Sequence, residues 1–397
     1  MSDTTATVPA EATPSRLPTA LVYDPAFLDH LVPDEFPEQP ERLRKSMEVI
    51  EALLGAGLLP AEHVLRLASR VATLDELATV HERAYVERVR LAVERLVERG
   101  GYEAGPSRFA SEVYVSAGSY NAALLAAGAP LVALDAIGEG KVRNGYALVR
   151  PPGHHARPAQ AMGFCLFNNV AVAARYAQRR WGWQRVLIVD FDVHHGNGTQ
   201  EMFYEDPDVL YFSTHQFPLY PGTGESDEMG AGAGLGTTVN VPLPAESGWS
   251  VYEPIFRQVL WPLADRFKPD VILLSAGFDA HWRDPLSDML LCTADFSDFT
   301  AEILEIADTY CGGRLVAVQE GGYDLDAVSH CAATLLFALT GSDKVIGDLG
   351  PTPAPSWRWN DEAIVRSLYE LHDLAGYRRK ARRIQLRTPP AVADATE

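Results

Sequence analysis

Cysteine is scarce in this chain, with only four residues among 397, namely Cys165, Cys292, Cys311 and Cys331. They are scattered along the sequence, without a CxxC pair or a short-spaced cluster. This pattern argues against a disulfide framework and favours a reducing compartment, so we expect a cytoplasmic protein. Cys165 lies next to a motif described below, where we expect it to be a small buried residue.

Basic residues are also few, because 34 lysines and arginines are set against 53 aspartates and glutamates, and the net charge is −19. Such a surface repels nucleic-acid phosphates, so we expect no direct nucleic-acid partner. It favours cationic partners such as polyamines or lysine-rich tails. Solubility alone is nevertheless the commoner reason for an acidic surface.

Long hydrophobic runs are missing as well. No apolar stretch approaches the length of about 18 residues that a membrane span requires, so we expect no membrane partner. Residues 1–16 lack the basic and apolar parts of a signal peptide, and their composition predicts a disordered tail. We expect one domain over residues 17–342, and a mostly helical extension over 343–397 that packs on this domain or at an interface. The sequence leaves a homo-oligomer open.

Short apolar runs alternate with longer helix-like segments along most of the chain. The expected strands are residues 19–23, 146–150, 186–190, 209–214, 271–275 and 315–319. The expected helices are residues 40–53, 74–99, 116–127, 168–180, 250–267, 294–309 and 363–384, with glycine-containing connections at 128–140 and 222–236. This alternation predicts an α/β fold in which helices cover both faces of a mostly parallel sheet. Ligands bind such sheets beyond the carboxyl ends of the strands, where polar residues gather in this chain.

The clearest polar cluster is the run Asp190-Phe-Asp192-Val-His194, which continues directly from an apolar strand. Side chains at i, i+2 and i+4 of a strand share one face, so we expect these three to point the same way. Two carboxylates on one side of a buried strand repel each other, and a cation is the simplest remedy. The alternative is an aspartate-capped turn before the glycines that follow.

A second apolar strand ends in Gly277-Phe-Asp279, and Asp279 is the natural further metal ligand. Two carboxylates and one imidazole leave a fourth position open for water, which is the pattern of a catalytic zinc site. Zinc in such a site lowers the pKa of water and polarises a carbonyl group. The alternative role for Asp279 is to cap the helix that follows.

Three more motifs follow or adjoin expected strands. His154 and His155 come after Arg-Pro-Pro-Gly, and one of them can act as a general base, unless both are metal ligands or surface residues. Tyr323, after Glu-Gly-Gly, can donate a hydrogen bond to a developing oxyanion, although a single tyrosine is more often a packing residue. Phe164 and Tyr220 lie in loops whose apolar members can wall a narrow channel or pack into the core.

Together these motifs resemble the histone deacetylase and acetylpolyamine amidohydrolase family. The matching segments are Pro-Pro-Gly-His154-His155, Gly-Phe164-Cys-Leu-Phe-Asn-Asn, Asp190-x-Asp192-x-His194-His-Gly-Asn197-Gly-Thr, Tyr220-Pro-Gly-Thr-Gly, Gly-Phe-Asp279-x4-Asp284-Pro and Glu-Gly-Gly-Tyr323. Six such segments in the family's order, over residues 20–340, are highly specific. The resemblance implies an arginase-like, three-layer α/β/α fold around an eight-stranded, mostly parallel sheet.

The resemblance also implies a metal centre. Its zinc ligands would be Asp192, His194 and Asp279. Asp190 would instead orient His154 through the imidazole N–H group, and would help the Ser213 hydroxyl to hold a structural potassium ion. The run that looks like a three-ligand strand would therefore supply two ligands and one orienting residue.

The catalytic groups and the substrate channel follow from the same resemblance. His155 would be the main general base and acid, His154 would assist it electrostatically, and Tyr323 would polarise the amide carbonyl. The channel would be lined by Gly163, Phe164, Tyr220 and Leu286.

The chain departs from the family's pattern at three positions. Asn197 stands where some members have an aspartate paired with the second histidine, and asparagine is common in the class II-like branch. Phe36 replaces the usual histidine of a His-Pro-Glu segment near the channel rim. Leu286 occupies the place where polyamine-selective members can have a gatekeeping glutamate, which argues against a polyamine substrate without excluding it.

We therefore expect a zinc-dependent deacetylase that removes acetyl or other acyl groups from amines, such as acetyl-lysine, acetylpolyamines or small molecules. A binuclear manganese ureohydrolase is the alternative enzyme on this fold. It needs further acidic ligands, whereas the residue after the paired histidines is Gly196 and the Gly277-Phe-Asp279 segment lacks Asp-x-Asp spacing. A silent binder of acylated lysine is expected to have lost a ligand or Tyr323, and this chain keeps them all.

Overall fold

An eight-stranded parallel sheet forms the centre of the molecule. The computed structural model describes residues 17–100, 103, 105–347, 349–350, 352–356 and 361–374, so the expected tail over 1–16 lies outside the described residues. The strands are β1 Thr19–Val22, β2 Val64–Leu67, β5 Asn144–Ala147, β6 Val186–Asp190, β7 Val209–Gln216, β8 Thr238–Leu243, β9 Val271–Ala276 and β10 Leu315–Gln319. Their order is β2-β1-β5-β10-β9-β6-β7-β8, and every neighbouring pair is parallel.

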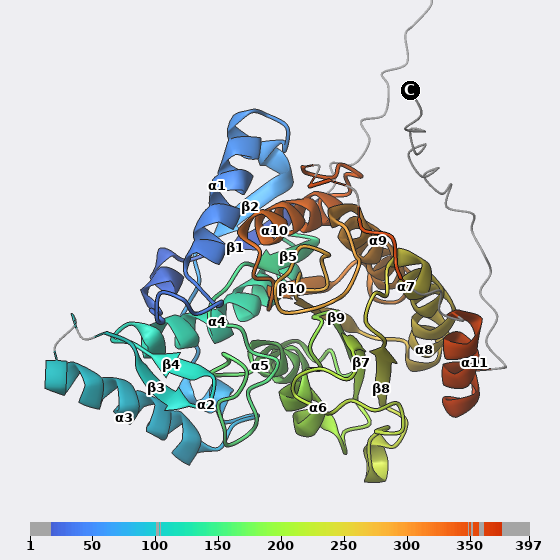
Figure 1. Ribbon diagram of the computed structural model, residues 1–397. Coiled ribbons are helices and arrows are strands. Elements are labelled where there is room, and N and C mark those ends of the chain that lie inside the picture. The colour runs from blue at the N-terminus through green and yellow to red at the C-terminus, as the bar shows by residue number, and fades with distance from the viewer. Residues whose placement is uncertain are drawn as a thin grey trace, which may run out of the picture.

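Helices cover both faces of this sheet (Figure 1). They are α1 Glu41–Gly55, α2 Leu74–Leu77, α3 Arg83–Gly100, α4 Ser119–Gly138, α5 Asn169–Tyr176, α6 Asn197–Phe203, α7 Trp249–Ile255, α8 Trp261–Phe267, α9 Thr293–Cys311, α10 Leu325–Leu339 and α11 Asp361–Leu371. Two π-helical turns, η3 Ala177–Trp181 and η5 Phe256–Leu260, continue α5 and join α7 to α8. Short 3-10 turns lie at η1 Pro25–Asp29, η2 Ala61–His63 and η4 Gly232–Gly234. The predicted α/β fold with a parallel sheet between helices is confirmed.

The central strands agree best with the sequence pattern. Every residue of β6, β9 and β10 is buried, as expected for continuous apolar runs covered on both faces. The two missed strands of this sheet, β2 and β8, lie at its edges. β2 is short and contains Arg66, and β8 contains Asn240 and Pro242. A proline is tolerated in an edge strand, which needs hydrogen bonds on one side only. The sequence of such a strand therefore resembles a strand less clearly than that of a central strand.

Helix α4 corrects one expectation. A connection was predicted over residues 128–140, but the helix runs through Gly128 and Pro130 to Gly138. Gly128 allows close packing rather than a turn, because a Cβ atom there would lie 1.7 Å from the carbonyl oxygen of Arg70. By length and composition α4 is also apolar enough to cross a membrane, contrary to the sequence expectation, but most of it is buried inside the protein.

Two further helix predictions were wrong in detail. The single helix expected over 74–99 is interrupted after α2, and the interruption places His81 in the interior. There the His81 ring donates to the Arg157 carbonyl through Nδ1 and accepts from the Asn168 N–H group through Nε2, so tertiary contacts outweigh the helical pattern. In the C-terminal extension, α11 ends at Leu371 and packs against α7 and η5, and residues 375–397 lie outside the described part.

The short β3 (Ser107–Ala110) and β4 (Val113–Val115) form an antiparallel hairpin apart from the main sheet. Its turn includes Ser111 and Glu112, and Glu112 contacts the functional site described next. Four cysteines are free thiols, and Cys165 is buried as predicted.

Candidate active site

The predicted functional residues lie beyond the carboxyl ends of four adjacent strands, β5, β10, β9 and β6. The loop after β5 carries the tandem histidines, the loop after β10 carries Tyr323, and the loop after β9 carries Asp279. The loop after β6 carries Asp192 and His194. Because parallel strands end at the same edge, residues far apart in sequence meet at one place.

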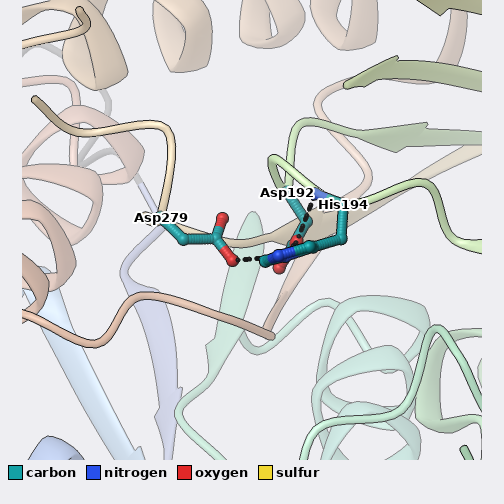
Figure 2. A group of neighbouring side chains, drawn as sticks. All are labelled: Asp192, His194 and Asp279. Carbon is teal, nitrogen blue, oxygen red and sulfur yellow. Dashed lines mark hydrogen bonds and ion pairs between the residues drawn. The ribbon is translucent and has the colours of Figure 1, made fainter. Parts of the chain in front are cut away.

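Asp192, His194 and Asp279 point toward one another (Figure 2), and each offers one ligand atom within 4.8 Å of the others. His194 Nδ1 lies 3.2 Å from Asp192 Oδ1 and 3.0 Å from Asp279 Oδ2. Tetrahedral zinc with ligand distances of about 2.1 Å separates its ligand atoms by about 3.4 Å, which is close to these values. All three side chains are buried, so two carboxylates here need a cation. The donor set therefore fits zinc.

Asp190 faces a different direction from the one that strand periodicity predicts. β6 ends at Asp190, so Asp192 and His194 belong to the following loop and not to one strand face. The Asp190 carboxylate accepts a hydrogen bond from His154 Nδ1 at 3.2 Å and from the Tyr211 hydroxyl at 3.1 Å. It lies behind the tandem histidines, outside the cluster of ligand atoms.

The tandem histidines lie side by side, with ring centroids 4.0 Å apart. The Glu320 carboxylate holds the backbone of their loop, because its Oε2 atom accepts the Gly153 N–H group at 2.6 Å and the His154 N–H group at 3.2 Å. His155 donates from Nδ1 to the Asn197 side-chain oxygen at 2.8 Å. This bond leaves Nε2 of His155 as the ring nitrogen that can accept a proton.

The two histidines differ in protonation. Burial lowers the pKa of His155 well below its ordinary value of 6.5, and the charges of His154 and His194 act in the same direction. Burial also disfavours a charged His154, but the carboxylates of Asp192 and Asp190 outweigh it and raise the pKa of His154 to about 10. A cation on Asp192 would weaken that effect. In the metal-free site His155 is therefore the neutral ring, with Nε2 free to accept a proton, and His154 is the charged ring.

Tyr323 lies in a segment without regular secondary structure, and hydrogen bonds to the backbone of this segment fix its position. The Arg42 guanidinium donates from Nε to the Gly322 carbonyl at 2.6 Å and from Nη2 to the Glu320 carbonyl at 2.6 Å, and it lies 4.9 Å from the Tyr323 ring centroid. Burial raises the pKa of the Tyr323 phenol well above 10, so the hydroxyl stays protonated and can donate.

A cavity of about 230 Å³ leads to these groups. It is lined by Glu112, His155, Gly163, Phe164, His194, Leu219, Tyr220, Leu286 and Tyr323. All four predicted channel residues are among them. Gly163 has a positive φ of 52°, and a Cβ atom there would lie 2.2 Å from the His155 ring, so only glycine lets this wall approach the histidine.

The departure at Phe36 has a structural consequence. Its ring packs edge-on against Phe164, with centroids 4.8 Å apart, and against Tyr114 at 5.0 Å. Phe36 therefore supports the channel wall from behind. Ser213 is not part of the channel; it pairs in register with Asp190 across β6 and β7, and its hydroxyl bonds Nδ1 of His215 at 2.9 Å.

Sequence reasoning missed several residues that contact the site, and Tyr211 and Glu112 are two examples. Tyr211, which donates to Asp190, lies two positions before Ser213 on β7, so strand alternation could have found it. Glu112 sits on the turn between β3 and β4 and accepts a hydrogen bond from the Tyr220 hydroxyl at 3.2 Å. No local signal connects that turn with the channel.

A central parallel sheet between helices, with buried candidate metal ligands and with His155 and His194 lining a cavity, defines a hydrolase of the arginase/deacetylase fold. The sequence pattern of the histone deacetylase domain matches residues 36–339. The chain belongs to the histone deacetylase family, as its motifs predicted.

Relatives from three organisms support this assignment. The chain is 41% identical to "Histone deacetylase 14, chloroplastic" of Arabidopsis thaliana, over 78% of this chain and 74% of the relative. It is 35% identical to a "Probable deacetylase" of Archaeoglobus fulgidus, over 90% and 96%. It is 39% identical to the "Histone deacetylase-like amidohydrolase" of Pseudomonas aeruginosa, over 78% of each. The crystal structure of the HDA15 HD domain matches with a TM-score of 0.78 and 38% identity, over 90% and 94% of the two chains.

Proposed function

We propose that this hydrolase is a zinc-dependent deacylase that removes an acetyl or similar acyl group from an amine. The observation that supports it best is that the cavity brings together three kinds of group. Its lining includes His194, one of the three ligand-type residues, together with the neutral His155 and the protonated Tyr323. Removal of an acyl group needs an electrophilic site for the carbonyl, a base and an oxyanion donor; a zinc ion held in part by His194 would supply the first, and His155 and Tyr323 supply the other two.

Asp192, His194 and Asp279 would hold the zinc ion. When bound there, zinc acts as a Lewis acid on the amide carbonyl and lowers the pKa of water. Nε2 of His155 takes the proton of the attacking water and later delivers it to the leaving amine, because Nδ1 is engaged by Asn197. His154, held by Asp190, contributes positive charge beside the developing oxyanion. The Tyr323 hydroxyl donates to the carbonyl oxygen.

The substrate is an acylated amine whose chain fits between Phe164 and Tyr220. Acetyl-lysine, an acetylpolyamine and a smaller acyl amine all satisfy this description. The structural potassium ion expected near Asp190 and Ser213 remains a proposal. Flame-emission or atomic-absorption analysis of protein dialysed into sodium and into potassium buffers tests it.

The decisive experiment combines a panel of acyl amines with two variants. Wild-type protein loaded with zinc should hydrolyse at least one member of a panel in which acyl length and amine charge vary. Tyr323→Phe should lower kcat by about 10²–10³-fold with zinc retained, which is the loss expected for one oxyanion donor. His155→Ala should be at least as impaired.

Metal analysis accompanies these assays. One zinc ion per chain is expected, whereas two ions per chain would favour the ureohydrolase alternative. Folded, zinc-loaded protein that hydrolyses no acyl amine would falsify the proposal and would leave a silent binder.

A further inference from the structure

The segment that carries Tyr323 has no regular structure of its own. It spans residues 320–324, between the end of β10 and the start of α10. Buried backbone groups need partners, so the hydrogen bonds of this segment must come from elsewhere. The Arg42 guanidinium donates hydrogen bonds to two of its carbonyl oxygens, and the Asp192 carboxylate accepts the Gly321 N–H group at 2.8 Å. The backbone N–H groups of Tyr323 and Asp324 have a different partner.

That partner is Asp284, a buried residue of the loop after β9. Its Oδ2 atom accepts the Tyr323 N–H group at 2.6 Å and the Asp324 N–H group at 3.3 Å. Its Oδ1 atom accepts the N–H group of Leu286, which lines the channel, at 3.0 Å. One carboxylate thus joins the backbone of the phenol donor to the backbone of the channel wall.

We propose that Asp284 is a positioning residue for the reaction, which sets where the Tyr323 hydroxyl points relative to the substrate carbonyl. The inference rests on the proposed function, because it takes Tyr323 to be the carbonyl donor. A carboxylate is required rather than a neutral polar group. Both of its oxygen atoms accept from N–H groups, and a neutral amide has only one oxygen atom with which to do so.

The isosteric change Asp284→Asn tests this requirement. An amide has one oxygen atom and one NH2 group, so either Leu286 or the Tyr323 and Asp324 pair must face a donor instead of an acceptor. A misplacement of about 1 Å at a catalytic group can cost about 100-fold in rate, so we expect kcat to fall by about tenfold or more. KM should change by less than about threefold, because the channel walls still bind the acyl chain.

A double-mutant cycle with Tyr323→Phe separates positioning from a general structural role. If Asp284 acts through the phenol, Asp284→Asn should lower kcat by less than about threefold once the hydroxyl is gone. A loss of equal size in both backgrounds, or no loss in the wild-type background, overturns the proposal. Asp295→Asn is the matched control. Asp295 is a buried carboxylate that accepts the Cys292 N–H group at 2.7 Å, at the start of α9, so this variant should keep the wild-type kcat.

Hydrogen–deuterium exchange of the segment 320–325 gives a readout that needs no substrate. It should rise in Asp284→Asn and stay at the wild-type rate in Asp295→Asn, with zinc content equal in all samples. If exchange is faster in Asp284→Asn but the wild-type protein shows no turnover, the proposed function is rejected and the anchoring is not. Unchanged exchange in Asp284→Asn would reject the anchoring. Should Asp284→Asn fail to fold, Asp284→Glu keeps the charge but displaces the carboxylate by one methylene group, and the same cycle applies with the same expected outcome.

Discussion

At the residue scale, the chemistry depends on which atom of a buried side chain faces which partner. His154 and His155 are neighbours in sequence, yet an aspartate accepts the N–H group of the first and an asparagine that of the second. A negative partner stabilises an imidazolium ion and a neutral amide does not. Burial lowers the pKa of His155, with the charges of His154 and His194 acting the same way, whereas the carboxylates of Asp192 and Asp190 outweigh burial at His154; the aspartate partner is thus one cause of the opposite directions in which the two pKa values move.

Asn197→Asp should therefore change the pH dependence of the reaction. A carboxylate beside Nδ1 favours the protonated form of His155, so the pKa of His155 rises, by about one unit or more. The base must be neutral to accept a proton, and the acidic limb of the kcat/KM profile should move to higher pH by the same amount. A pH–rate profile of the zinc-loaded variant checks this. An acidic limb that stays in place would show that His155 is not the group that titrates.

Glu112 is the single carboxylate among the residues that line the cavity, and it is half-buried beside Tyr220. We expect its charge to give the channel an electrostatic preference that the apolar walls cannot supply. An amine substrate with a second, protonated nitrogen would be attracted to it.

Glu112→Gln should consequently raise KM for a charged substrate and leave KM for a neutral one unchanged. Partly exposed ion pairs contribute about 0.2–1 kcal/mol, which corresponds to at most about a fivefold change. N-acetyl-1,4-diaminobutane and N-acetylbutylamine form a matched pair of equal chain length. Equal changes in KM for both compounds would count against a role for the charge.

At the scale of elements, local pattern and tertiary packing compete, and α4 shows where packing wins. Gly128 and Pro130 look like a break in the sequence, yet the helix continues and is buried through both. Glycine costs about 0.5–1 kcal/mol relative to alanine in a helix, so its presence needs a compensating reason. The close approach of the Arg70 carbonyl supplies that reason.

Gly128→Ala should accordingly destabilise the protein although alanine is the better helix former. The added methyl group meets a backbone carbonyl that cannot move alone, and overpacking of this kind costs about 1–3 kcal/mol. Gly55→Ala, at the end of α1 with nothing within 4 Å of the new methyl group, is the control and should be neutral or slightly stabilising. Urea denaturation of the two variants measures the difference; a stabilised Gly128→Ala would contradict the close packing.

At the scale of the whole molecule, the loops at the carboxyl edge of the sheet bring the buried carboxylates of Asp192 and Asp279 together, and their repulsion must be relieved by a cation or by protons. Burial disfavours a charged His194, but hydrogen bonds to Asp192 and Asp279 outweigh it and raise the pKa of His194 to about 10 in the metal-free site. In the metal-free site, the extra proton on His194 thus partly relieves the repulsion between the two carboxylates. Because the folded pKa lies above 6.5, this stabilisation is complete below about pH 6.5 and is lost as the pH rises toward 10.

Removal of zinc by a chelator should therefore lower Tm, and more so at high pH. A ligand at about 1,000 times its Kd contributes about 4 kcal/mol, which is about 5 °C for a chain of this length. The decrease should be smaller at about pH 6.5 than at about pH 9, since metal binding displaces protons. Differential scanning calorimetry with and without chelator measures it. A decrease that shrinks as the pH rises would contradict the assignment of His194 as a ligand.

Much of the fold and of the site could be predicted because the signals are local. The buried strands β6, β9 and β10 are continuous apolar runs, and Asp192, His194 and Tyr323 stand within a few residues of their ends. Strand geometry acts over neighbouring residues, so these patterns can be recognised in the sequence alone. The edge strands β2 and β8 could not, because their burial depends on one neighbour each.

The sequence by itself determined which chemical groups this protein has and roughly where each follows a strand. Only the tertiary structure decided which of them meet: Asp190 with Tyr211, Glu112 with Tyr220, and Asp284 with the backbone of Tyr323. The physical reason is the strand order. β9 lies between β6 and β10, and the β3–β4 hairpin lies against the channel, and neither arrangement is encoded by a periodicity within one segment.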